Sequence, residues 1–262
     1  MDAYGANWKS KQKEEYMNEE EIINTKNLLK ECIYRTSMSD DYFGLSAREF
    51  EELQNSVNAL DNTSLILSDE KIQISIRKWK KDCFTILKKL YECMINSVNS
   101  EDIMMKTQEI LQDSNTKEGT YSSVYKNYTL AIKVFKKSDN YSYEQIRKIY
   151  NSQIDAYIKA KDDIELLVHL PVFFGSMNIC KIFDKNGNDI SDNYHLDLNY
   201  VVEYINGNFV KYSTASENEC NRIKTLFKQN GINYIMDSLV IFDGVQIVKI
   251  IDFATENHKI LS

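Results

Sequence analysis

The sequence predicts a mixed α+β protein with a helical first part and a second part of short strands and helices. Between residues 72 and 98 apolar side chains recur at steps of three and four, which is the period of a helix. After Gly119 this period gives way to short runs rich in Tyr, Val and Ile, which are typical of strands. A chain of 262 residues is long enough for two modest domains. We therefore expect a helical bundle or cap over residues 1–112 and a second domain over residues 115–262.

The first part is expected to hold four helices. Their ranges are residues 20–34, a helix that starts at Ser46, residues 72–98 and residues 101–111. Ser46 and Glu49 fit a capping box, and Ser68–Asp69 is the expected N-cap of the third helix. The polar faces mix both charge signs, so we interpret them as solvated faces rather than docking or membrane-binding surfaces.

The second part is expected to run strand, strand, helix, strand, strand, helix and a final hairpin. The expected ranges are residues 121–125, 130–135, 143–160, 179–183, 194–205, 217–229 and a strand pair around Asp243–Gly244. Asn127–Tyr128 joins the first two strands as a hairpin, and the turn-forming residues 184–188 precede the long strand.

Composition and charge narrow the class of protein. The formal net charge is −7, whereas a nucleic-acid binder normally carries a basic surface, so we expect no nucleic-acid partner. The longest apolar run, residues 239–242, is far shorter than the ~20 residues that cross a bilayer. The N-terminus lacks the pattern of a secretory signal, and five scattered cysteines indicate reduced thiols. We expect a cytoplasmic or otherwise intracellular protein without a membrane span.

Three segments of the second part carry residues suited to a nucleotide. The hairpin formed by Glu118-Gly119-Thr120-Tyr121-Ser122-Ser123-Val124-Tyr125 and Ala131-Ile132-Lys133-Val134 brings backbone N–H groups and a lysine to the same phosphates. The helix that follows carries an acid at Asp155. Further on, Asp252-Phe253-Ala254 ends a predicted strand, where an acid is suited to hold Mg²⁺ against phosphate oxygens.

These segments resemble the glycine-rich loop, the V-A-I-K strand and the D-F-G segment of protein kinases. The resemblance covers about residues 115–255 and implies a kinase-like core with an antiparallel-sheet N-lobe. The chain ends about ten residues after Asp252, so we expect a reduced C-lobe, similar to that of minimal bacterial effector kinases. Lys117 and Ser122 stand at two of the three usual glycine positions of the loop, and Ala254 replaces the last glycine of D-F-G.

The resemblance implies ATP and Mg²⁺ as cofactors and a role for each matched residue. The nucleotide-binding residues it implies are Gly119, Ser122, Val124, Ala131, Lys133, Asp155 and Glu203. Asp155 is the expected partner of Lys133, and Glu144, near the start of the same helix, is its competitor. Asp252 and Ser238 are the implied metal ligands.

The sequence departs from the kinase pattern at the catalytic loop. Residues 231–241 align with H-R-D-x-x-x-x-N, which puts Asn233 at the base and Ser238 at the second metal ligand. An asparagine does not accept a proton as a carboxylate does. A register shift would instead make Asp237 the base or a metal ligand, and both registers stay open.

Three functions are therefore compared. The first is an ATP-dependent phosphotransferase of the Ser/Thr protein kinase type, acting on a protein substrate. The second is a catalytically inactive pseudokinase that presents a surface to a partner protein, and the third is an α+β interaction protein without kinase ancestry. Substitution of Lys133 or Asp252 by alanine abolishes transfer under the first reading and leaves partner binding intact under the second.

Overall fold

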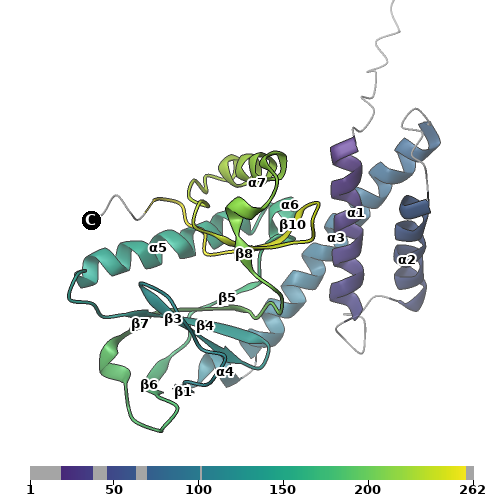
Figure 1. The fold of residues 1–262 in the computed structure, drawn as a ribbon. Helices are drawn as coiled ribbons and strands as arrows, with labels where there is room; N and C mark the ends of the chain where they lie inside the picture. Colours follow the sequence, from purple (N-terminus) through teal and green to yellow (C-terminus); the bar gives the residue numbers. More distant parts are fainter. Residues whose placement is uncertain (1–18, 38–45, 63–69, 101, 258–262) are drawn as a thin grey trace, which may run out of the picture. The chain divides into compact units, whose positions relative to one another are not determined.

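A computed structural model describes residues 19–37, 46–62, 70–100 and 102–257 (Figure 1). The architecture mixes helix and sheet, as the sequence predicts. The chain divides into two compact units, Met1–Leu87 and Lys88–Ser262. This division falls inside a helix, ahead of the boundary near residue 112 that the sequence suggests. Within the described ranges, no helix combines the length and the apolar character that a bilayer crossing requires.

The first unit consists of helices. They are α1 (Glu19–Ser37), α2 (Ala47–Asn62) and the larger part of α3 (Glu70–Ser100). The capping box of α2 is confirmed, because the Ser46 backbone N–H donates to Glu49 Oε2 at 2.8 Å and the Glu49 N–H donates to Ser46 Oγ at 3.3 Å. The N-cap expected at Ser68–Asp69 lies outside the described residues. The buried apolar residues of this unit include Ile22, Leu28, Leu29, Cys32, Ile76, Cys83 and Leu87.

The helix predicted over residues 101–111 is wrong in its second half. Helix α4 (Asp102–Met105) is a single turn, and strand β1 (Gln108–Leu111) follows it. Strand β1 pairs in parallel with β6 (Ile179–Phe183), and Ile110 is buried. A four-residue run has no period that separates helix from strand. Its pairing with a segment far along the chain therefore decides the conformation.

The second unit is built on a five-stranded antiparallel sheet in the order β2-β3-β4-β7-β5. The strands are β2 (Lys117–Glu118), β3 (Ser122–Asn127), β4 (Leu130–Lys136), β5 (Phe173–Gly175) and β7 (Tyr194–Glu203). The predicted hairpin is confirmed, and Tyr128 turns the chain with a φ of 51°. Central strand β4 is almost wholly buried, and it holds Lys133 opposite Val124 and Tyr200.

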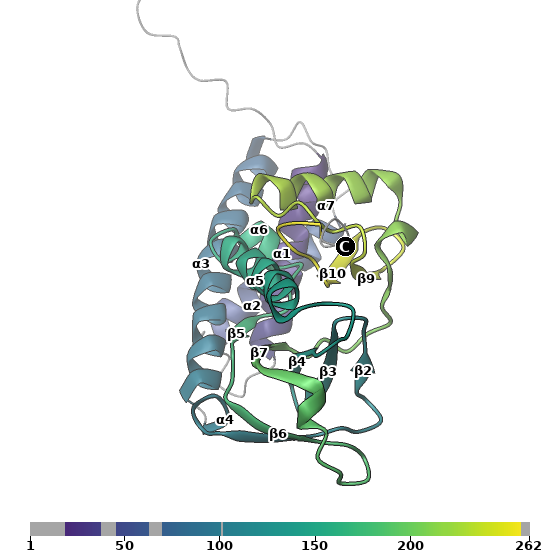
Figure 2. The same ribbon diagram turned by 90° about the vertical axis from the view of Figure 1, so that its left-hand side faces the viewer.

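Helix α5 (Tyr143–Ala160) has the bounds that the sequence predicts. Ser142 begins it with a capping box, because its Oγ accepts the Gln145 N–H and the Gln145 side chain accepts the Ser142 N–H. The helix lies between the sheet and helix α7 (Glu217–Gln229) in both ribbon views (Figures 1 and 2). A short helix, α6 (Ile164–Leu167), follows it.

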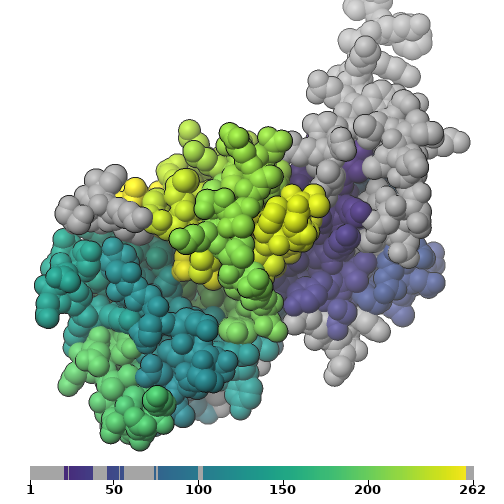
Figure 3. All heavy atoms as spheres, in the orientation of Figure 1, coloured from purple at the N-terminus to yellow at the C-terminus, as the bar shows by residue number. Residues whose placement is uncertain are grey.

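The C-terminal segment adds a three-stranded antiparallel sheet in the order β10-β9-β8. Its strands are β8 (Val210–Lys211), β9 (Leu239–Phe242) and β10 (Ile247–Ile251). The segment, yellow in Figure 3, lies next to the green of α7. Phe227 of α7 and Phe253 after β10 meet edge to face at 5.3 Å between ring centres, deep in the core.

Buried polar groups fix strand β10. Lys249 Nζ donates to the carbonyl of Val168 at 2.7 Å, and the Ile250 N–H donates to the carbonyl of His169 at 2.8 Å. Glu219 Oε1 accepts the Ile247 N–H at 2.7 Å. Because hydrogen-bonded buried polar groups have few alternative positions, these bonds hold the strand that ends at the candidate site.

The same cluster makes stability depend on pH. Burial, helped by the cations of Arg222 and Lys249 and opposed by Glu219, lowers the pKa of His169 from 6.5 to about 4. Between those values the unfolded chain binds more protons than the folded protein, so the free energy of unfolding falls as the pH falls. We expect a loss of about 3 kcal/mol across this window.

Urea unfolding of wild type and His169→Gln at a series of pH values from about 7 to 4 measures this loss. We expect the pH slope to flatten in the variant and to persist in His195→Gln, whose ring is only partly buried. An unchanged slope in His169→Gln would show that other groups carry the pH dependence.

Candidate functional site

A cavity of about 390 Å³ opens where four segments of the second unit meet. Its volume lies in the range of small-molecule sites. The residues that line it are Gly119, Thr120, Tyr121 and Ser122 of the β2–β3 turn, Lys133 of β4, Gln153 of α5, and Tyr234, Asp237, Asp252 and Ala254 of the C-terminal segment. Of the eleven residues that the sequence singled out, the structure brings five to this cavity: Gly119, Ser122, Lys133, Asp237 and Asp252.

An ion pair spans the cavity. Lys133 Nζ donates to Asp252 Oδ1 at 2.7 Å, and it lies 5.7 Å from the centre of the Tyr200 ring. The lysine side chain is 10% exposed and the aspartate side chain 43% exposed. One end of the pair is therefore fixed inside the sheet, while the other faces solvent.

The backbone conformation at Asp252 lets the Asp252 carboxylate face the cavity while the next side chain, Phe253, lies in the core. Asp252 has a φ of 61°, in the left-handed region, which aspartate tolerates better than most residues. This turn leaves the carboxylate on the cavity while Phe253, the next side chain, is 2% exposed in the core.

The glycine-containing turn is closed by its own hydrogen bonds. The Gly119 N–H donates to the carbonyl of Ser122 at 2.8 Å. Lys136 Nζ donates to the carbonyl of Gly119 at 3.0 Å and pairs with Glu118, whose carboxylate also accepts the hydroxyl of Ser123 at 2.9 Å. The cation of Lys136 is thus held at the outer edge of the turn, and a Cβ at position 119 would lie 3.2 Å from the Ser122 carbonyl oxygen.

The prediction that Asp155 of α5 pairs with Lys133 is wrong. Asp155 and its competitor Glu144 are both exposed, and neither lines the cavity. Gln153 lies there instead, and its Oε1 accepts the hydroxyl of Tyr200 at 2.9 Å. Residues two apart lie about 200° apart around a helix. The buried stripe that includes Ser152, Ala156 and Ala160 therefore turns position 155 toward solvent.

The catalytic-loop segment reaches the cavity through Asp237. Asn233 is exposed and does not line the cavity. Asp237 does line it, and its Oδ2 accepts the hydroxyl of Tyr234. Tyr234 is itself held by paired backbone bonds with Ala254, at 3.0 and 2.9 Å. Partial burial and the Asp237 carboxylate raise the pKa of the Tyr234 phenol, so this tyrosine stays a donor to the carboxylate.

Ser238 holds the backbone of the site. The residue is 1% exposed, and its hydroxyl donates to the carbonyl of Asp252 at 3.0 Å. The Ser238 carbonyl accepts the Tyr212 N–H at 3.0 Å. The structure therefore places this predicted metal ligand behind Asp252, where it fixes the turn.

Three predicted nucleotide-binding residues lie away from the cavity. Ala131 belongs to the hydrophobic core, and Val124 packs against that core. Glu203 is buried, and its carboxylate accepts the Val172 N–H at 3.3 Å. Sequence reasoning had no role for Gln153, Tyr121 or Tyr234, which do line the cavity. The period of α5 is the signal that could have found Gln153.

The two carboxylates of the cavity are too few to hold a metal ion alone, but they fit a metal that phosphate oxygens also bind. In the part of the chain that the structure describes, no group of three or more His, Cys, Asp or Glu side chains could hold a metal ion. The cavity offers Asp252 and Asp237. Mg²⁺ is commonly held by one or two carboxylates plus substrate phosphates, so this donor set fits a magnesium nucleotide.

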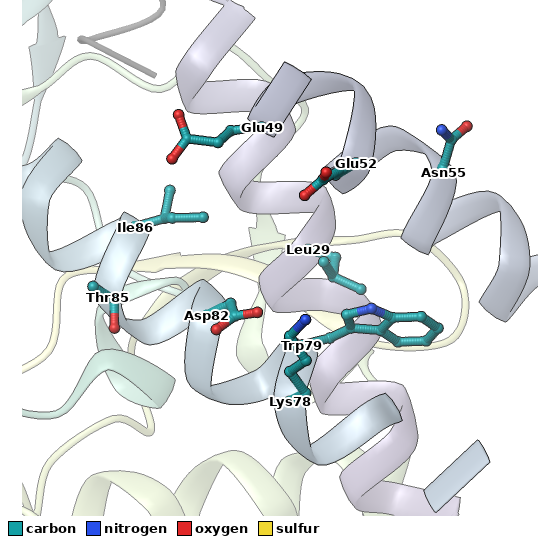
Figure 4. Close-up of a pocket in the computed structure, with 9 residues that line it drawn as sticks. All are labelled: Leu29, Glu49, Glu52, Asn55, Lys78, Trp79, Asp82, Thr85 and Ile86. Carbon is teal, nitrogen blue, oxygen red and sulfur yellow. The ribbon is translucent and has the colours of Figure 1, made fainter. Parts of the chain in front are cut away.

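A second cavity, of about 480 Å³, lies among the helices of the first unit (Figure 4). Trp79 and Asp82 of α3 line it, with Glu49 and Glu52 of α2. Both glutamates have partners within their own helix, since Glu49 caps the helix at Ser46 and Glu52 pairs with Arg48 at 3.0 Å. This cavity shares no lining residue with the site around Lys133.

Comparisons of the chain with protein-family models and with the sequences of curated proteins gave no match.

Ser238→Ala tests whether Ser238 fixes the turn. Loss of the hydroxyl leaves the Asp252 carbonyl without its donor, so we expect the free energy of unfolding to fall by about 1–2 kcal/mol. Urea unfolding without nucleotide or magnesium measures this change. Ser213→Ala, which removes an exposed hydroxyl, is the matched control and should change stability by less than about 0.5 kcal/mol. A Ser238→Ala effect seen only with magnesium would instead point to a metal ligand.

Proposed function

We propose that the second unit binds magnesium ATP between Lys133 and Asp252 and transfers the terminal phosphoryl group to a hydroxyl of a protein substrate. The observation that carries this proposal is the 2.7 Å ion pair between these residues beside the turn at Gly119. The lysine and the acid come from β4 and from the end of β10. They are the two residues for which the kinase resemblance implies contacts with phosphate and Mg²⁺. A cytoplasmic or otherwise intracellular location, where ATP is abundant, goes with this proposal.

The chemistry asked of the site is mainly electrostatic. Phosphoryl transfer relies on positioning and on neutralising charge that spreads over the phosphate oxygens. Lys133 supplies one fixed cation, and residues 119–122 of the turn line the same cavity. Magnesium, when bound, neutralises charge on the phosphates. The half-exposed carboxylate of Asp252 would hold the magnesium ion.

Asp237 is the candidate general base. A base has to reach the hydroxyl from which it takes the proton, and Asp237 is exposed at the cavity, whereas Asn233 lies outside it. The hydrogen bond from Tyr234 orients the carboxylate. Of the two registers left open by the sequence, the one that uses Asp237 therefore has the support of the geometry.

One observation favours a second candidate, a pseudokinase that binds nucleotide without transferring phosphate. The α5 residue beside the ion pair is Gln153, and a neutral amide cannot share the charge of Lys133 as a carboxylate would. The negative charge that pairs with Lys133 comes from Asp252. A site of this kind could use the nucleotide to stabilise a surface for a partner protein.

Thermal unfolding with ATP, with and without Mg²⁺, tests nucleotide binding. We expect a magnesium-dependent rise in melting temperature for wild type, because ligand that binds only the folded protein stabilises it. The rise should be lost in Asp252→Asn and Lys133→Met. Asp155→Asn, which alters an exposed acid on α5, should retain it. Absence of a shift in wild type would leave two interpretations, a pseudokinase that binds no nucleotide and the α+β interaction protein.

Asp237→Asn separates the kinase from the pseudokinase. Loss of a general base typically lowers the rate by ~10²–10⁴-fold, so we expect transfer of labelled γ-phosphate to fall by about this factor while ATP affinity stays within about twofold. Asn233→Ala is the control and should transfer at the wild-type rate. Binding of ATP without any transfer by wild type would decide for the pseudokinase.

A further inference from the structure

Residues 203–207 begin at the last residue of strand β7, and Glu203 is the predicted nucleotide-binding residue among them. The Glu203 N–H donates to the carbonyl of Val172 at 2.9 Å, and the Tyr204 N–H donates to the carbonyl of Thr129 at 2.7 Å. These two backbone donors are therefore committed to loops of the protein itself.

The space beside this segment is filled by side chains. A Cβ at Gly207 would lie 2.3 Å from Ile241 Cδ1, so β9 packs directly against the segment. Ala131 is in the hydrophobic core together with Val240 and Ile250, both 0% exposed. None of residues 203–207 lines the cavity. The cavity that holds the ion pair therefore does not extend to this segment.

The cavity instead offers aromatic rings to the part of a nucleotide that extends beyond its phosphates. Tyr121 and Tyr234 both line it and both are partly buried. The Tyr121 ring meets Tyr141 edge to face at 5.2 Å between ring centres, and the Tyr234 hydroxyl donates to Asp237 Oδ2. Both rings are therefore held in place. Stacking on an aromatic face is available to every base, because every base has a π-face.

We propose that this site selects a nucleoside triphosphate by its magnesium triphosphate and not by its base, with the base stacked on Tyr234 beside Tyr121. The inference rests on the proposed nucleotide-binding function and names its ligand class more closely. Gln153, the amide that lines the cavity, has its oxygen engaged by the Tyr200 hydroxyl. The Gln153 amide oxygen and the N–H groups of Glu203 and Tyr204 therefore already have partners within the protein.

Competition binding to the full-length protein with Mg²⁺ tests the inference. We expect ATP, GTP, CTP and UTP to bind within about threefold of one another. Inorganic tripolyphosphate, which keeps the charge and lacks the base, should bind roughly 5- to 150-fold more weakly, as loss of one stacked base implies. Tripolyphosphate as tight as ATP would overturn the stacking.

Variants at Tyr234 test whether the base stacks on the Tyr234 ring. Tyr234→Ala should weaken all four nucleotides by a similar factor and leave tripolyphosphate binding unchanged, while Tyr234→Phe, which keeps the ring, should bind as wild type. Tyr128→Ala, a substitution at an 88% exposed tyrosine on the far turn of the hairpin, is the matched control. Preference for ATP by more than about tenfold would overturn this inference and leave the proposed function standing. No binding of any nucleotide would overturn both.

Discussion

Tyr157 of α5 stacks on Phe173 with 5.1 Å between ring centres, and it packs on Phe253 at 4.7 Å. One buried side chain thus joins the helix to the five-stranded sheet and to the segment that carries Asp252. Aromatic pairs in such geometries add about 0.5–1.5 kcal/mol each beyond the area they bury. The place of Asp252 in the cavity depends on this cluster, because Phe253 follows Asp252 directly and leaves it little freedom. Burial raises the pKa of the Tyr157 phenol well above its ordinary value, so the group stays neutral in the core.

Hydrogen bonds at Thr255, Asp252 and Lys249 also hold the C-terminal segment. The Thr255 N–H donates to the carbonyl of Ser152 at 3.1 Å, and the two hydroxyls lie 2.9 Å apart. The Ser238 hydroxyl donates to the Asp252 carbonyl, and Lys249 Nζ in β10 donates to the carbonyl of Val168. Each bond satisfies a buried polar group whose exposure to apolar surroundings would otherwise cost free energy. Together they make the turn at Asp252 rigid, which a site that works through electrostatics requires.

The ion pair on this frame is asymmetric. Lys133 has little access to water and would be costly to bury without a partner, whereas Asp252 is half exposed and stays solvated on one side. A phosphate oxygen could take the place of the aspartate as the partner of Lys133, and the released carboxylate would face solvent and metal. The arrangement therefore suits a ligand that brings both negative charge and a divalent cation.

The sequence by itself determined the elements with strong local signals. Helices α5 and α7 have the predicted bounds, because each begins at a serine N-cap and carries a regular buried stripe. The β3–β4 hairpin followed in the same way from its turn residues and β-branched runs. Lys133 stood out from its neighbours Ala131, Ile132 and Val134 in β4, and Asp252 from its place directly after the apolar strand β10.

Only the tertiary structure decided which side chains share the cavity. The strand at β1 required a partner in β6, far along the chain. The structure places Asp237 and not Asn233 at the cavity, and Ile241 of β9 fills the space beside Gly207. These features arise from contacts between segments far apart in the chain, and no local pattern of residues encodes such contacts.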